Sequence, residues 1–195
     1  MPFLSSIASG SARGYGFGRA IAASAGATNS YFPIASYTVT TAQSSITFAG
    51  IPQNFTHLEI RCGLNGTAAG TFGNGRMGFN GDSGANYSSH NMYGYASATG
   101  AQSEVSGSRM YTQIYTSLAS TSSYLGVAVI DILDYANTNK YKTTKSLNGI
   151  EFNSDGSTRF SSGNWRNTAA ITSVEFVIDS GNFNVGSNIS IYGVN

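Results

Sequence analysis

Apolar and polar residues alternate along short stretches of this chain, and this alternation constrains the fold more than any other feature of the sequence. In residues 57–64, apolar side chains occupy every second position, at Leu58, Ile60, Cys62 and Leu64. Because successive side chains of a β-strand point to opposite faces, this spacing predicts a strand with one buried face. After residue 35, no segment of helical length shows an apolar period of 3.6, so we expect no helix there.

Further strand signals follow one another closely and are separated by turn-forming Gly, Asn, Asp and Ser. The most apolar run, residues 124–134, predicts a central strand covered on both faces. Asn80 and Gly81 directly follow a short strand signal and are typical of a β-hairpin turn. The predicted strands are residues 37–41, 45–48, 57–64, 76–79, 87–96, 109–115, 124–134, 141–152, 158–165, 171–179 and 188–194. This pattern is typical of an all-β protein, and we expect an antiparallel, jelly-roll-like β-sandwich.

Residues 1–34 differ from the rest, because they are rich in Gly, Ala and Ser and offer little from which to build a core. Large apolar side chains are nevertheless spaced along them. We therefore expect an extended N-terminal arm that becomes ordered on a partner, followed by a β-sandwich domain of residues 35–195. The expected anchors of this arm are Phe3, Leu4, Ile7, Tyr15 and Phe17.

Charge is scarce in this sequence. Charged residues make up 10% of the chain and the formal net charge is +1, whereas a typical domain has about 25% charged residues. A nearly neutral surface argues against nucleic acid as a partner. No apolar run approaches the length of a membrane span, so we expect no membrane insertion. The single cysteine, Cys62, excludes an intrachain disulfide and a cysteine-built metal site, and we expect it in the core.

Groups that could carry catalysis are few and scattered. Asp131 and Asp134 lie three residues apart on a predicted strand, so their side chains would point to opposite faces. The two histidines, His57 and His90, cannot form a three-histidine zinc site, and no catalytic sequence motif is present. We therefore expect no enzyme, no cofactor and no metal site.

Tyrosine, asparagine and serine are abundant, and these residue types support adaptable contacts with a ligand. Exposed aromatic rings suit sugars in particular, because a ring can stack on a pyranose while amides bind its hydroxyl groups. The residues that we expect on such a ligand face are Tyr87, His90, Tyr93, Tyr95 and Trp165.

Several segments resemble small β-structured virion proteins of tailed bacteriophages. The most specific is residues 129–142, with the sequence VIDILDYANTNKYK. The other matching segments are residues 44–61, 79–87 (with His90, Tyr93 and Gly94 after it), 146–149, 161–165, 171–173 and 190–193. Their order and spacing match over residues 40–195, and no catalytic residues come with the resemblance.

The resemblance implies a structural protein of the virion, assembled in the host cytoplasm. We expect a homo-oligomer, most readily a trimer, that contacts other virion proteins of the baseplate, tail or capsid. The expected function is that of a tail-fibre or baseplate-attached appendage, which docks through its N-terminal arm and adsorbs to host surface glycans.

Two alternatives remain at this point. A capsid decoration or head-fibre protein that stabilises the shell would need the same arm and the same sandwich. A tail-associated glycan-processing enzyme, the minor alternative, would need two carboxylates about 5–10 Å apart in a cleft. The residues to map for such a pair are Asp131, Asp134, Glu151, Asp155 and Asp179.

Overall fold

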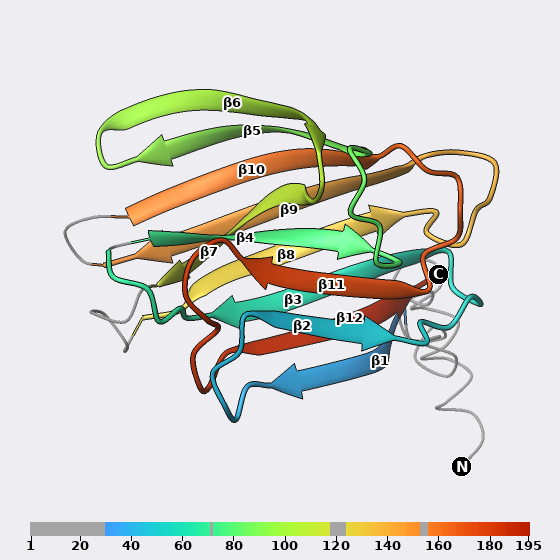
Figure 1. Ribbon diagram of the computed structural model, residues 1–195, viewed down its shortest axis with the longest axis horizontal. Helices are drawn as coiled ribbons and strands as arrows, with labels where there is room; N and C mark the ends of the chain where they lie inside the picture. Colours follow the sequence, from blue (N-terminus) through green and yellow to red (C-terminus); the bar gives the residue numbers. More distant parts are fainter. Residues whose placement is uncertain (1–29, 71, 118–123, 153–155) are drawn as a thin grey trace, which may run out of the picture. The chain divides into compact units, whose positions relative to one another are not determined.

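The computed structural model describes residues 30–70, 72–117, 124–152 and 156–195 (Figure 1). The chain divides into two units, Met1–Ser30 and Tyr31–Asn195, and only the second is described below. The arm residues Phe3, Leu4, Ile7, Tyr15 and Phe17 lie outside the described residues. Within the described ranges the structure contains strands and no helix, as the alternating pattern predicts.

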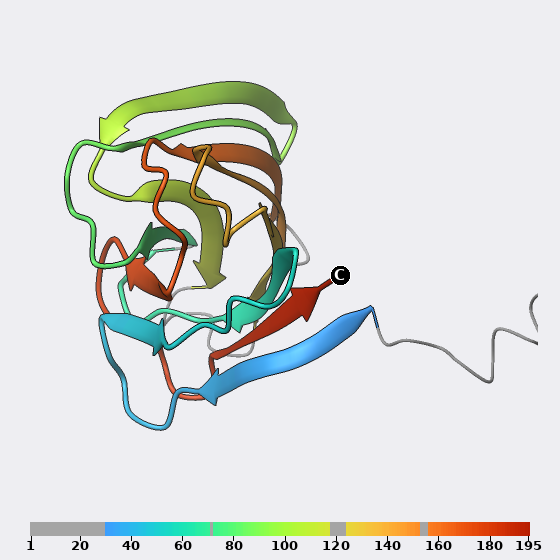
Figure 2. The same ribbon diagram turned by 90° about the vertical axis from the view of Figure 1, so that its right-hand side faces the viewer.

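The strands form two antiparallel sheets. The larger sheet has the order β1 (Tyr31–Thr38), β12 (Asn188–Val194), β3 (His57–Leu64), β8 (Gly126–Leu133), β9 (Lys142–Glu151), β10 (Gly156–Trp165), β5 (Tyr87–Tyr95) and β6 (Ala98–Gly107). The smaller sheet has the order β2 (Ser45–Ala49), β11 (Ser173–Ile178), β4 (Phe72–Phe79) and β7 (Met110–Ser117). Figure 2 shows that the larger sheet curves around the smaller one.

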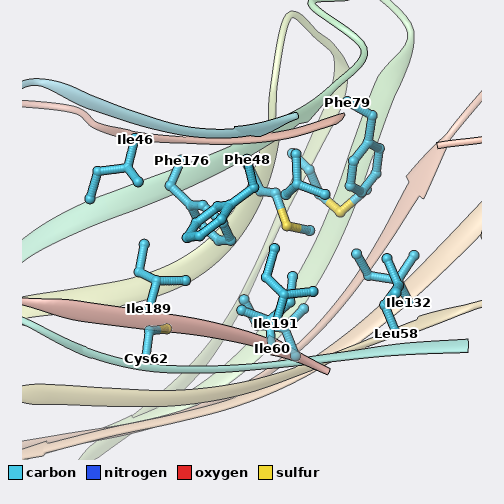
Figure 3. Close-up of a cluster of buried hydrophobic side chains, with 14 of the residues drawn as sticks. Ile46, Phe48, Leu58, Ile60, Cys62, Phe79, Ile132, Phe176, Ile189 and Ile191 are labelled. Atoms are coloured by element: carbon cyan, nitrogen blue, oxygen red, sulfur yellow. The ribbon is translucent and has the colours of Figure 1, made fainter. Parts of the chain in front are cut away.

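A hydrophobic core lies between the two sheets. Ile60 on β3 and Ile191 on β12 are cross-strand partners, and both are fully buried. They face Phe48 and Phe176 from the smaller sheet, whose rings meet edge to face (Figure 3). Cys62 also lies in this core, as expected. Burial of each large apolar side chain contributes about 1.5–3 kcal/mol, so this cluster holds the two sheets together.

One expectation about β8 is wrong. Its position between β3 and β9 is central, but only one of its faces is covered. Ala128, Ile130 and Ile132 point into the core, whereas Val127 and Val129 are exposed on the other face of the larger sheet. Apolar residues at most positions led to the expectation of two covered faces, but no described element packs on the outer one.

The turn at Asn80 and Gly81 forms, but it does not make a hairpin. Both residues have positive φ, at 53° and 68°, and the amide of Asp82 donates to the carbonyl oxygen of Phe79. Strand β4 before the turn belongs to the smaller sheet, whereas β5 after it belongs to the larger sheet. The turn therefore begins a crossing between sheets rather than an antiparallel pair.

One further strand and one strand boundary differ from the sequence prediction. Strand β6 was not predicted, because its residues, ATGAQSEVSG, include few strong strand formers. Strand β1 begins at Tyr31, which pairs with Val194, so residues 31–34 are part of a strand and not of the arm. The register shifts between Pro33 and Ala35, which lets this edge strand accommodate the proline.

Candidate interaction sites

Two residues of the expected ligand face belong to the core. Tyr87 and Trp165 are 0% and 1% exposed, and they are cross-strand partners at the ends of β5 and β10. Their rings stack at 6.3 Å, and the Phe79 ring lies 5.5 Å from that of Trp165. These side chains fill the space between the sheets, so they cannot contact a ligand at the surface.

The remaining three residues do not share one surface. His90 is exposed on the outer face of β5, whereas Tyr93 points to the inner side, where the Arg159 guanidinium lies 4.8 Å from its ring centroid. Tyr95 lies at the end of the strand with its ring against that of Phe72. The alternation of side chains along β5 separates His90 from the two tyrosines, so the expected ligand face is not assembled.

An apolar row crosses the outer face of the larger sheet. Val129, Leu147, Phe160 and Met92 are consecutive cross-strand neighbours on β8, β9, β10 and β5. Their exposed fractions are 43%, 57%, 45% and 62% respectively. The outer face of an antiparallel sheet that meets water is normally polar. We call these four residues the outer apolar row, and contiguous exposure of this kind is typical of an interaction surface.

Shallow hollows flank the outer apolar row. One hollow of about 520 Å³ is lined by Met92, Leu147 and Phe160 together with Gly94. Gly94 and Gly149 leave open space on this face, since a β-carbon at either position would meet no atom within 4 Å. Protruding side chains beside hollows give a surface against which a second apolar surface can pack with good shape complementarity.

Charges beside the outer apolar row are neutralised within the chain. The Lys145 ammonium lies 2.8 Å from the Asp131 carboxylate, and the hydrogen bond raises the pKa of that lysine. On β3, Arg61 and Glu59 pair at 2.7 Å. Because these pairs carry no net charge, they do not repel a second copy of the same surface.

Strand β6 forms a free edge of the larger sheet among the described residues. Its ten residues contain no lysine, arginine or proline, the residue types that usually discourage pairing at an edge. The edge continues the outer face at Ala101, which pairs with Met92. This edge and the outer apolar row form one continuous surface suited to contacts with another protein.

A polar cleft lies on the opposite side of β5 and β6. It has a volume of about 330 Å³, and its lining includes Arg76, Asn91, Glu104 and Tyr111. Arg76 on β4 donates to both carboxylate oxygens of Glu104 on β6, at 2.9 and 3.1 Å, and so connects the two sheets. Its guanidinium lies 4.5 Å from the centroid of the Tyr111 ring. Burial and the nearby Asp179 carboxylate raise the pKa of the Tyr111 hydroxyl.

Three of the carboxylates named for the enzyme alternative, those of Asp131, Asp134 and Asp179, pair with basic side chains, and a fourth, that of Glu151, lies at the end of β9. Asp131 pairs with Lys145, and Asp134 pairs with Lys140 at 2.6 Å. Asp179 accepts a 2.7 Å hydrogen bond from Arg76, the same side chain that binds Glu104. Asp155 lies outside the described residues. No cluster of three potential metal-ligating side chains occurs in the part of the chain that the structure describes.

The sequence did not predict the residues of the outer apolar row or of the polar cleft. On β9 the polar positions on either side of Leu147 are buried and Leu147 itself is exposed. The sequence alone therefore suggests a strand that buries Leu147, which is the opposite of what the structure shows. Arg76 and Glu104 are 28 residues apart and meet only because β6 curves over the smaller sheet (Figure 2).

No described helix is long and apolar enough to cross a membrane. Comparison of the sequence with protein-family models and curated proteins, and of the structure with solved structures, found no match.

Proposed function

We propose that this chain is a structural protein of a bacteriophage virion, a tail-fibre or baseplate-attached appendage built from several copies. Residues 1–30 dock each copy onto the particle, and residues 31–195 project from it and adsorb to host surface glycans. The scaffold is an antiparallel β-sandwich of jelly-roll type, and three copies form the oligomer. We propose no catalytic activity and no cofactor for it.

The outer apolar row is the observation that carries this proposal. Phe160 and Leu147 lie side by side on the outer face, where a monomer would gain from polar residues instead. A second copy presents the same neutral surface, so contact between copies removes apolar area from water without repulsion between charges. Attachment in many copies also makes weak individual contacts sufficient for adsorption.

The resemblance of residues 40–195 to virion proteins supports the same conclusion from the sequence. The core contains a free buried cysteine, Cys62, and no disulfide is formed by the described residues. This agrees with assembly in a reducing cytoplasm, where stability must come from packing and from association between copies.

Deletion of residues 1–30 tests the docking role. We expect the shortened chain to remain folded and oligomeric but to be missing from purified particles. Normal incorporation of the shortened chain would contradict the proposal.

Electron microscopy of particles labelled on this chain tests its location. We expect the label on the tail. A label on the head would replace the appendage with the capsid decoration protein, the alternative that shares the same arm and fold. A particle without label would contradict both.

A further inference from the structure

The interior beneath β5 and β6 is polar, although it lies between two packed sheets. Gln102, Asn91, Ser161 and Ser146 are consecutive cross-strand neighbours on β6, β5, β10 and β9. Asn91 is 7% exposed, and the two serines are each 2% exposed. A row of short polar side chains in this position does not contribute the apolar burial that holds the rest of the core together.

Two oxygen atoms of this polar row have no hydrogen-bond partner among the described residues. They are Oδ1 of Asn91 and Oγ of Ser161, which lie on directly opposite residues of neighbouring strands. The amide nitrogen of Asn91 donates to the carbonyl oxygen of Gln102 at 3.4 Å, which leaves its side-chain oxygen as the free acceptor. Buried polar atoms almost always have a partner. Of these two residues, Asn91 also lines a cleft that opens to the surface.

The polar cleft reaches Asn91 from the surface. Besides Asn91, its lining includes Ser89, Gln102 and Glu104. Arg76 closes one side of the cleft, because it is fixed by hydrogen bonds to Glu104 and Asp179. The volume of about 330 Å³ lies at the lower end of the range of small-molecule sites.

We infer that this cleft binds a neutral sugar residue. The amide oxygens of Asn91 and Gln102 and the carboxylate of Glu104 are hydrogen-bond acceptors, and the hydroxyl groups of a sugar can donate to them. Ser89 can both donate and accept, which matches a hydroxyl group that also does both.

Other ligand classes fit this lining less well. An anion would meet the carboxylate of Glu104 and the acceptor oxygens of the amides, and the one guanidinium there, Arg76, is already paired with two carboxylates. An apolar ligand would leave Asn91 Oδ1 without a partner. A polyhydroxylated ligand supplies donors for these oxygens and displaces water from the cleft.

The inference rests on the adsorption role in the proposed function and names its site. It places the site at Asn91 on the inner face of β5, the face of Tyr87 and Tyr93, and not at His90 on the outer face. Adjacent residues of β5 point to opposite faces, so the two positions provide a matched comparison within one strand.

The test uses the full chain and the methyl glycosides of glucose, galactose, mannose and N-acetylglucosamine as probes. Saturation-transfer NMR detects binding, and chemical-shift titration up to about 10 mM gives the Kd. We expect at least one probe to bind the unaltered chain and His90→Ala with equal affinity. The substitutions Asn91→Ala and Gln102→Ala should each weaken its binding by roughly tenfold or more.

Gln102 lies on the edge strand β6, so Gln102→Ala provides a cleft variant that does not depend on substitution of a buried residue. Equal binding by both cleft variants and the unaltered chain would overturn the inference, as would failure of every probe to bind. Incorporation of the chain into particles is measured separately. A chain that is incorporated but binds no glycoside refutes the sugar site alone, and a chain absent from particles refutes the virion function.

Discussion

The indole nitrogen of Trp165 donates a 2.7 Å hydrogen bond to a carboxylate oxygen of Asp82. Trp165 ends β10 in the core, whereas Asp82 lies in the loop that crosses from the smaller sheet to the larger one. The same carboxylate accepts hydrogen bonds from the amide of Gly84 and from the side chain of Asn86. One acidic side chain therefore fixes the crossing loop to the aromatic cluster beneath it.

Substitution of Asp82 should destabilise the domain. In Asp82→Ala the buried indole N–H loses its acceptor, and we expect the free energy of unfolding to fall by about 1–3 kcal/mol. Urea denaturation followed by tryptophan fluorescence measures this change, because Trp165 is the only tryptophan of the chain. Asp131→Ala is the control, since its partner Lys145 is exposed and we expect a loss below about 1 kcal/mol. Equal losses in the two variants would contradict this role of Asp82.

The contribution of Asp82 should also depend on pH. Desolvation disfavours its charged form, but the hydrogen bonds from Trp165, Asn86 and Gly84 outweigh this and lower its pKa below the ordinary value of 3.8. A lowered pKa in the folded state gives stability that is present above pH 3.8 and is lost as the pH falls through the folded-state value. We expect the difference in unfolding free energy between the unaltered chain and Asp82→Asn to shrink below that pH. A difference that stays constant from neutral pH into this acidic range would exclude the linkage.

The thiol of Cys62 should be unreactive in the folded protein. Burial raises the pKa of this thiol to about 12, so almost none of it is thiolate at pH 8. We expect the thiol to react slowly with Ellman's reagent in buffer, at a rate limited by unfolding of the protein. In urea the reaction should be rapid. Fast reaction of the native protein would show that the core opens around β3.

Gly193 should tolerate no side chain. A β-carbon at Gly193 would overlap the ring of Phe55, which is stacked on Phe32 at 5.4 Å. We expect Gly193→Ala to lower the free energy of unfolding by about 1–3 kcal/mol. The matched variant Gly149→Ala, at an open position of the same sheet, should change it by less than about 0.5 kcal/mol. Thermal denaturation of the two variants side by side decides between these outcomes.

Self-association should depend on the outer apolar row. Leu147→Glu places a charge in the middle of this row, and we expect the association constant between copies to fall by roughly tenfold or more. The stability of each copy should change little, because Leu147 is exposed in the single chain. Sedimentation velocity measures the oligomer. Val185→Glu, on an exposed loop before β12, is the control, and identical sedimentation of all three proteins would argue against this interface.

The sequence was sufficient to predict the strands that have an apolar buried face and a polar exposed face. Residues 57–64 and 188–194 are strands with the predicted bounds, and both bury their apolar positions. The all-β class and the antiparallel pairing follow from many such segments. Strand β6 was missed because small residues such as Ala98 and Gly100 carry little strand signal of their own. The strand is held by its pairing with β5, and a single sequence does not show that pairing.

The sites were less accessible to prediction than the strands. On β9, Thr144, Ser146 and Asn148 are buried and Leu147 is exposed, so the alternation indicates a strand but suggests the wrong inner face. Aromatic content suggested Tyr87 and Trp165 as ligand contacts, although large rings are more often used to fill a core. The polar cleft depends on the curvature of the larger sheet, which local sequence does not specify.

The inverted polarity of β9 has a consequence for how stability depends on concentration. Leu147 and Phe160 keep much of their surface in water when a single chain folds, so in the proposed oligomer part of the hydrophobic free energy of this sequence is released only when copies meet. By mass action, folding and association are then linked equilibria, and the thermal midpoint rises with the amount of protein. Such a chain is most stable where copies are crowded together, and dilution makes it easier to unfold.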